Sequence, residues 1–473
     1  MMKLFTSLML VLALGVTSPA YASQDGEVTL KLIETSDVHG CYFSYDFISM
    51  KPRKGGLACV SSFVKEQRKH YGDGVVLMDN GDILQGQPIA YYYNYIDTTS
   101  VHVTSAMLNY MKYDVGTMGN HDVETGHAVY DRWVKQCAFP VLGANIVDNK
   151  TGEPYLTPYK IIEREGVKIA VLGMITPAIP SWLPEQLWNG LHFEDMEDCA
   201  RKWVKIIKEK ENPDVLVGLF HAGPEGNKLD NVVENGSGDV AKNVPGFDVV
   251  FMGHDHVRRC EKIVNVAGDS VLLIDPANAA KYVSDVTVKV TKAGGKLVRK
   301  SVEGALVDVS RYAADEDFMR EFAGQYQATV DFVSRKIGRI EETITTKDAY
   351  FGPSAFIDLL HQLQLDITGA DISFCAPLSF SAEIKKGDIY MDTTWSADEI
   401  FNDKLANLGN EAKRRLIELL AASLTFSDSK QDDDRLFEEI CGSWADDGLT
   451  AEEEIKELQT ARRQDTTRNI INL

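Results

Sequence analysis

The chain is poor in the features that mark zinc-ribbon, redox and nucleic-acid-binding proteins. Its 473 residues include only seven cysteines, and no two of them are spaced as C-x-x-C. This excludes a zinc ribbon and a thioredoxin-like motif. We expect most cysteines to be small buried side chains, although some could pair in an oxidising compartment. The net charge is −21, so a nucleic-acid polymer is not expected as a ligand, since its partners usually present a basic surface.

Long apolar runs are also missing beyond the N-terminus. No stretch after residue 22 approaches the roughly 20 apolar residues of a membrane-spanning helix, so we expect no membrane in the mature form. Residues 1–22 contain Lys3, an apolar stretch over 8–16 and a small-residue cleavage site ending at Ala22, the pattern of a secretory signal peptide. The alternative is a membrane anchor, but the apolar stretch is too short and no cysteine follows it for lipid attachment. We expect a secreted protein, periplasmic or extracellular.

Five short groups of Asp, Asn and His residues stand out in the first half of the chain. Each group follows an apolar run that is typical of a buried strand. The groups are Asp37 and His39 after 28–33, Asp82 after 75–78, Asn120 and His121 after 115–118, His221 after 215–219, and His254 and His256 after 249–252. Open α/β sheets bind ligands outside the carboxyl ends of their strands, which predicts one shared site.

These donor types indicate a metal site. Mixed Asp, Asn and His ligands suit Mn, Zn, Fe or Co. An extended conformation would place Asp37 and His39 on one side of the chain, where they could bind one ion together. His254 and His256 are also two residues apart, so on an extended segment they could face the same ion or two different ions.

The order of the motifs DxHG, GDxxQG, GNHD, FHAG and GHDH resembles that of the calcineurin-like metallophosphoesterases, over about residues 28–310. The segments 34–40 and 79–88 are similar to those of secreted nucleotidases, which comprise 5′-nucleotidases and 2′,3′-cyclic-nucleotide phosphodiesterase/3′-nucleotidases. The resemblance implies two divalent metal ions. It assigns Asp37, His39 and His256 to the first ion, Asn120, His221 and His254 to the second, and Asp82 to both.

The resemblance also implies a proton donor for the leaving group, His121, which a carboxylate three residues later orients in these enzymes. Here that carboxylate is Glu124, and Asp122 is the alternative. Asp79 is interpreted as structural. The tyrosines of 91–95 could line the substrate cleft or pack in the core, and the substrate-binding residues stay unknown.

We predict an α/β fold, a layered metallophosphoesterase β-sandwich flanked by helices, over residues 23–314. Residues 160–171 are expected to form a hairpin, and 315–345 a linker helix. Residues 346–390 resemble the start of the second nucleotidase domain, as a partial α+β domain. Where the family carries Asn-Gly-Gly-Gly-Ile-Arg before its Gly-Asp-Ile segment, this chain has residues 375–380 without that arginine.

Residues 391–473 are acidic and read as helical, with Leu416 and Leu420 on one face of a predicted helix. They carry neither the Pro-Phe-Gly-Asn turn nor the second base-binding aromatic of the nucleotidases, and their end resembles the tail of small bacterial antitoxins. We hypothesise that an unrelated reading frame beginning near Met391 has been joined to a truncated nucleotidase. The alternative is a genuine helical cap of this family.

The predicted function is two-metal hydrolysis of phosphate esters, with nucleotides as the expected substrates, in which a metal-bound hydroxide attacks in line and His121 assists the leaving group. The first alternative is a general secreted phosphatase without nucleoside specificity. The second is an interaction protein whose helical tail binds a protein partner.

Overall fold

The computed structural model describes residues 26–391 apart from 227, 230, 231, 348, 350–352 and 376–381. The predicted signal peptide and, beyond residue 391, the predicted acidic tail lie outside the described residues. The chain divides into two compact units, residues 1–360 with 377–403 and residues 361–376 with 404–473. Of the second unit the structure describes residues 361–375, where His361 Nδ1 lies 2.8 Å from Ser373 Oγ.

The first unit contains two six-stranded sheets. The strand order of the first sheet is β18 (Lys296–Asp308), β17 (Tyr282–Ala293), β1 (Gly26–Thr35), β4 (Val75–Asp79), β5 (Val115–Thr117) and β6 (Val141–Leu142). The last four strands run parallel, and β17 pairs antiparallel with both β1 and β18. β1, β4 and β5 contain the apolar runs that the sequence predicts, whereas β6 was not predicted.

The strand order of the second sheet is β15 (Arg259–Val264), β16 (Ser270–Asp275), β14 (Val249–Phe251), β11 (Val215–His221), β9 (Val167–Ile175) and β8 (Tyr159–Arg164). The four central strands are parallel, and an antiparallel strand closes each edge. The predicted hairpin over 160–171 is confirmed as β8 and β9.

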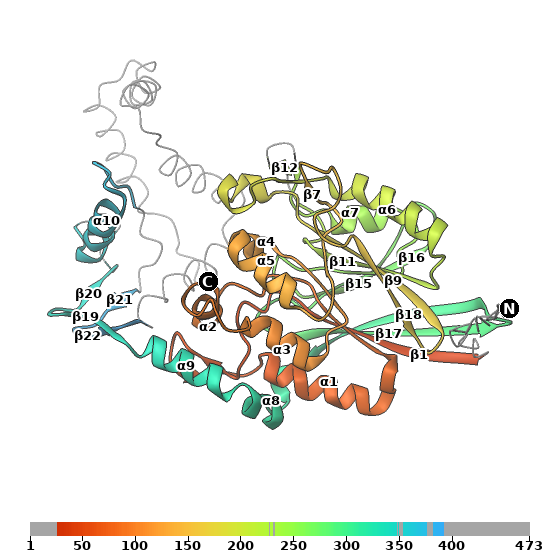
Figure 1. The fold of residues 1–473 in the computed structure, drawn as a ribbon, viewed down its shortest axis with the longest axis horizontal. Coiled ribbons are helices and arrows are strands. Elements are labelled where there is room, and N and C mark those ends of the chain that lie inside the picture. The colour runs from red at the N-terminus through yellow and green to blue at the C-terminus, as the bar shows by residue number, and fades with distance from the viewer. Residues whose placement is uncertain are drawn as a thin grey trace, which may run out of the picture. The chain divides into compact units, whose positions relative to one another are not determined.

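Three apolar clusters hold four layers together. The two sheets face each other across a core that includes Leu32, Val217 and Val288. The outer face of the first sheet is covered by α1 (Leu57–Tyr71), α3 (Val103–Met111) and α5 (His127–Gln136), and that of the second by α6 (Met196–Lys210) and α7 (Ser237–Asn243) (Figure 1). Cys59 and Cys199 are buried in these outer layers as unpaired thiols. The predicted α/β sandwich flanked by helices is confirmed.

The prediction of one linker helix over 315–345 is wrong. The structure has α8 (Glu316–Glu321), α9 (Ala323–Val333) and then two strands, β19 (Lys336–Ile340) and β20 (Ile344–Thr345). The helix breaks at Phe322, whose side chain is buried with Phe318 and Phe332 in the core under the first sheet. These aromatic side chains give the segment a packing role, and helical periodicity alone does not reveal a break of one residue.

The resemblance to a second domain over 346–390 corresponds to a small set of elements. β19 pairs with β22 (Gly387–Tyr390) and β20 with β21 (Glu383–Ile384), both antiparallel, and α10 covers Ala355–Thr368. Among the residues that the structure describes, no helix is both long and apolar enough to cross a bilayer. The remaining short strands are β2 (Tyr45–Asp46), β3 (Lys51–Pro52), β7 (Ile146–Asp148), β10 (Leu191–Phe193), β12 (Lys228–Leu229) and β13 (Val232–Val233).

Candidate metal centre

The seven predicted ligands lie at the carboxyl ends of parallel strands from both sheets. They are Asp37 and His39 after β1, Asp82 after β4, Asn120 at the start of α4 (Asn120–Val123) after β5, His221 at the end of β11, and His254 and His256 after β14. The Asn80 side-chain amide donates a hydrogen bond to the carbonyl of Phe220 at 3.0 Å. This bond ties the loop after β4 to the end of β11 and so holds the two sheet edges together.

Asp37, His39 and His256 form a first cluster. One ligand atom from each lies within 4.8 Å of the others. The Nε2 atoms of His39 and His256 are 3.0 Å apart, and Asp37 Oδ1 lies 3.3 Å from His256 Nε2. The three atoms converge on one point, and with a cation there both imidazole nitrogens would direct their lone pairs at it.

Asp82, His221 and His254 form a second cluster of the same kind. His221 Nε2 lies 3.2 Å from Asp82 Oδ2. Asn120 joins this cluster, because its Oδ1 lies 3.1 Å from His221 Nε2 and 2.9 Å from His254 Nδ1. Asp37 Oδ1 is 4.0 Å from His221 Nε2, so the two clusters are neighbours. The structure thus brings together all seven side chains.

The expected extended conformation of the ligand segments is wrong. Asp37, His39, Asp82, His254 and His256 all have positive φ angles, between 49° and 76°. Residues with side chains rarely adopt this left-handed region, which costs on the order of 1–3 kcal/mol per residue and is typical of functional sites. Tight turns, not alternation along a strand, therefore aim these side chains at the centre.

Glycines beside the ligands allow the loops to approach one another. A Cβ atom at Gly253 would lie 2.2 Å from Ser36 Oγ and 2.7 Å from Asp37 Oδ2, and one at Gly119 would lie 2.1 Å from Asp82 Oδ1. Such distances are far below van der Waals contact. The motif glycines are therefore needed for space around the carboxylates.

Hydrogen bonds on the far side of two rings set their tautomers. His221 Nδ1 lies 2.6 Å from the carbonyl oxygen of Asn80, and His39 Nδ1 lies 2.9 Å from Oε1 of Gln85. Both acceptors need a proton on Nδ1, so each Nε2 keeps its lone pair for the centre, as is usual for metal-binding histidines.

The electrostatics of the centre favour cations. Burial acts against a charged imidazole, yet the carboxylates of Asp82 and Asp37 raise the pKa of His221 to about 10. Burial likewise acts to raise the pKa of Asp37, but the charges of His221 and His256 hold it below the ordinary value. For His39, burial and then the charge of His256 lower the pKa to about 4. Two buried carboxylates thus attract positive charge, and protons supply it where no metal ion is bound, so this donor set fits divalent cations.

His121 and Glu124 form a hydrogen-bonded pair beside the ligands. His121 Nδ1 lies 2.5 Å from Glu124 Oε2, and the ring centroids of His121 and His39 are 5.5 Å apart. Burial acts against protonation, but the carboxylates of Asp82 and then Glu124 raise the pKa of His121 to about 9. A protonated imidazole at the edge of the centre is a suitable general acid.

The carboxylates of Asp122 and Asp79 make structural hydrogen bonds. Asp122 is buried and accepts hydrogen bonds from the backbone N–H groups of Asp82, Ile83, Leu84 and Gly119. Asp79 accepts from Thr35 Oγ1 at 2.7 Å. Asp122 therefore shapes the loop that carries Asp82, whereas the ring of His121 bonds to Glu124.

The tyrosines of 91–95 divide between the two interpretations. Tyr93 is buried, and the ring of Tyr92 packs against that of Phe332 from α9 with centroids 5.3 Å apart. Tyr91 and Tyr95 are exposed and contact each other, with centroids 5.1 Å apart. Tyr92 and Tyr93 thus pack in the core, whereas a place in the substrate cleft stays a prediction for Tyr91 and Tyr95.

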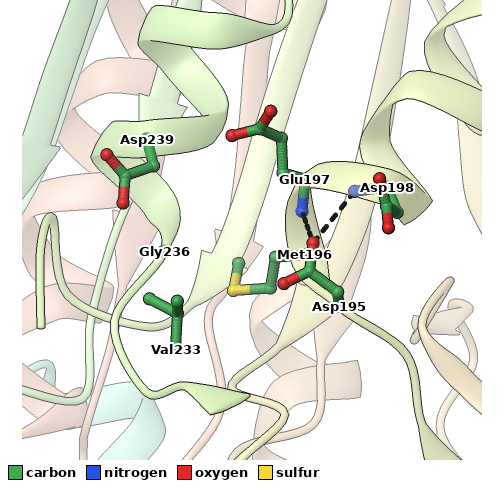
Figure 2. Close-up of a pocket in the computed structure, with 7 residues that line it drawn as sticks. All are labelled: Asp195, Met196, Glu197, Asp198, Val233, Gly236 and Asp239. Carbon is green, nitrogen blue, oxygen red and sulfur yellow. Dashed lines mark hydrogen bonds between the residues drawn. The ribbon is translucent and has the colours of Figure 1, made fainter. Parts of the chain in front are cut away.

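A separate pocket of about 150 Å³ lies at the N-terminal ends of α6 and α7 (Figure 2). Its seven lining residues include four carboxylates and none of the predicted ligands. Asp195 explains part of this acidic lining, because its side chain caps α6 by accepting the N–H groups of Glu197 and Asp198 at 2.9 and 3.0 Å. The pocket is therefore no part of the metal centre.

Sequence reasoning missed three supporting residues: Asn80, Gln85 as a partner of His39, and Glu234. Glu234 Oε1 lies 3.0 Å from His254 Nε2. Glu234 is 20 residues before its partner and belongs to none of the five motifs. No local pattern could identify it, because the contact depends on two separate loops meeting at the sheet edge.

The chain is similar to several known proteins. Residues 30–258 match the model of a family described as calcineurin-like phosphoesterase. The chain is 29% identical over 383 residues to a 2′,3′-cyclic-nucleotide 2′-phosphodiesterase/3′-nucleotidase of Haemophilus influenzae, covering 75% of this chain and 58% of that protein. It is 26% identical over 359 residues to the trifunctional nucleotide phosphoesterase protein YfkN of Bacillus subtilis, covering 70% of this chain and 24% of that protein.

A solved structure of calcineurin-like phosphoesterase YfkN from Bacillus subtilis is also similar, with a TM-score of 0.58 and 26% identity. It covers 65% of this chain and 100% of that structure's chain. The chain spans less than two thirds of the length of the two curated relatives.

Proposed function

We propose that the protein is a two-metal hydrolase of small phosphate esters, and the match of residues 30–258 to the calcineurin-like phosphoesterase family supports this. Its substrates include nucleotides, as the names of similar proteins suggest, a 5′-nucleotidase and a 2′,3′-cyclic-nucleotide phosphodiesterase/3′-nucleotidase. The observation that carries this proposal is the position of two neighbouring metal-binding clusters beside the His121–Glu124 pair.

The residues present would hold two divalent ions, Mn, Zn, Fe or Co by their donor chemistry. Asp37, His39 and His256 would hold one, Asn120, His221 and His254 the other, and Asp82 both. When bound, such ions activate water and neutralise phosphoryl oxygens in an in-line displacement.

The protein's own contribution to bond cleavage comes from His121. Glu124 accepts from Nδ1, and Nε2 is then the proton donor to the leaving oxygen. The exposed fraction of the His121 side chain is 31%, so a substrate can reach it from solvent.

Metal removal tests the reaction class. We expect hydrolysis of a simple aryl phosphate to stop after dialysis against a chelator and to return with Mn²⁺ or Co²⁺. Activity that survives complete metal removal, checked by elemental analysis, would contradict the proposal.

A reduced preference for the nucleoside part of the substrate is a second element of the proposal. Residues 391–473 carry neither the Pro-Phe-Gly-Asn turn nor the second base-binding aromatic of the nucleotidases, and residues 375–380 do not contain the arginine of their motif. We therefore expect similar kcat/KM values for adenosine 5′-phosphate, 2′,3′-cyclic AMP and an aryl phosphate, which is the behaviour of a general phosphatase. A strong preference for either nucleotide would refute this element and leave the reaction class intact.

Export and the tail form a third element. We propose that residues 1–22 are removed on export to the periplasm or medium, which N-terminal sequencing of the exported protein beginning at Ser23 would support.

We also propose that residues 391–473 are an unrelated fused segment that could bind a protein partner. Intact-mass measurement and resequencing of the locus test the fusion, and two separate products in the native source would contradict it.

A further inference from the structure

His254 differs from His221 in the nitrogen that faces the centre. His221 presents Nε2 to Asn120 and Asp82. His254 instead has Nδ1 at 2.9 Å from Asn120 Oδ1, while its Nε2 lies 3.0 Å from Glu234 Oε1. Since a carboxylate accepts only, Nε2 must carry the proton, and Nδ1 keeps the lone pair.

Glu234 is itself anchored to the strand that carries His221. Its backbone carbonyl accepts a hydrogen bond from Thr176 Oγ1 at 2.7 Å, and the Thr176 N–H donates to the carbonyl of His221 at 2.9 Å. The next residue, Asn235, accepts from the Gly223 N–H at 2.6 Å through its side-chain oxygen. The backbone that carries this carboxylate is therefore held at the end of β11.

Trp182 restricts the same imidazole from its face. The ring centroids of Trp182 and His254 are 5.4 Å apart, with an interplanar angle of 31°. Trp182 follows the short helix η3 (Ile179–Ser181), and its backbone N–H donates to Ile179. With one ring face covered and one nitrogen bonded, the His254 ring has little freedom to flip.

We propose that Glu234 is a positioning residue that selects Nδ1 of His254 as a ligand atom and strengthens the binding of the second metal ion. The inference rests on the proposed two-metal function. A carboxylate that accepts from the distal nitrogen of a ligand histidine fixes its tautomer and raises its basicity, and removal of such a partner typically weakens metal binding about 10–100-fold.

The effect is selective for one ion. Glu234 contacts His254 of the second cluster and, among the described residues, no member of the first. The first cluster has its own partners, such as Gln85 on His39. A general loss of structure would instead weaken both ions together.

Calorimetric titration of the metal-free full chain with Mn²⁺ tests the proposal. We expect two ions to bind wild type, and we expect Glu234→Ala to lose about 10–100-fold in affinity for one ion with the other unchanged. Glu234→Gln retains an acceptor oxygen without the charge, so it should fall between wild type and Glu234→Ala. The visible spectrum of the Co²⁺ form should change in Glu234→Ala at one site only.

Glu225→Ala is the matched control, because Glu225 is an exposed glutamate between His221 and Glu234. It should bind both ions as wild type does. Equal affinities in wild type and Glu234→Ala would overturn the inference alone. Parallel loss of both ions with a lower melting temperature would overturn it in favour of a folding role, whereas a wild type that binds fewer than two ions would overturn the proposed function as well.

Discussion

The two metal clusters use the same donor types but differ in how deeply they lie. In the second cluster His221 and Asp82 are buried, and His254 is only 12% exposed. In the first cluster His256 is 24% exposed. The second cluster is also held by hydrogen bonds to a carboxylate and a backbone carbonyl, those of Glu234 and Asn80, whereas the first has the neutral amides of Gln85 and Asn278.

This difference in burial and in hydrogen bonding predicts which of the two ions binds more tightly. A buried cluster whose ligands are fixed by hydrogen bonds loses less side-chain entropy when it binds an ion, so we expect that ion to exchange slowly. The more exposed first cluster lies next to the His121 ring. We therefore expect the second ion to be the tighter one and the first to be the more exchangeable.

The strongest test of this comparison removes the ligand that both ions are expected to share. Asp82→Asn should abolish binding of at least one ion and lower kcat by about 10³-fold or more, because a bridging carboxylate balances two cations. Metal analysis and steady-state kinetics check this. An Asp82→Asn protein with both ions in place would show that Asp82 does not bridge.

Removal of the proton donor should leave the clusters intact. His121→Ala is expected to lower kcat for substrates with poor leaving groups by about 10²–10⁴-fold while both ions stay bound. Glu124→Gln should have a smaller effect of the same kind, and aryl phosphates with good leaving groups should be affected least. A normal rate in Glu124→Gln with a lost rate in Asp122→Asn would give the orienting role to Asp122.

The two clusters can be compared directly by single histidine changes. His221→Ala should weaken the tighter ion and His256→Ala the weaker one, each by about 10–100-fold or more, measured by competition with a chromogenic chelator. Asn278→Ala is a milder variant for the first cluster, since its amide lies 3.2 Å from His256 Nδ1. Loss of the tighter ion in His256→Ala would reverse the order that burial predicts.

His102 is a buried histidine without a carboxylate partner, and its pKa shifts in the opposite direction to that of His221. His102 is fully buried, and burial followed by the charge of Arg132 lowers its pKa to about 3. Its ordinary pKa is near 6.5 in the unfolded chain, so its stabilising contribution is present above that pH and is lost as the pH falls toward 3.

We expect the free energy of unfolding to fall by up to about 1.4 kcal/mol per pH unit from this residue between pH 6.5 and 3. His102→Gln should show a shallower slope than wild type in denaturant titrations at several pH values. Equal slopes in the two proteins would contradict the assignment.

The catalytic half of the fold could be read from the sequence because each parallel strand is a buried apolar run followed by polar ligands. The strands around Leu32, Leu77 and Val217 lie where periodicity predicts them. The linker could not be read in this way. Phe318, Phe322 and Phe332 suit one continuous amphipathic helix equally well, and only their packing under the first sheet reveals the break at Phe322.

Within the site, the residue types were predictable and their geometry was not. Asp37, His39, His254 and His256 were assigned to extended segments, but their positive φ angles place them in tight turns. Backbone strain of this kind is compensated by contacts from distant parts of the chain, so it leaves no local trace except the glycines at 119 and 253.

From the residues alone, Asp, Asn and His donors follow five buried strands, and the order of the motifs implies by resemblance how these donors divide between two ions. The packed structure adds that Glu124 and not Asp122 bonds His121 and that Glu234 holds His254. A buried strand is recognised from the pattern of a few consecutive residues. A hydrogen bond between two loops that are far apart in the sequence depends instead on how whole sheets pack.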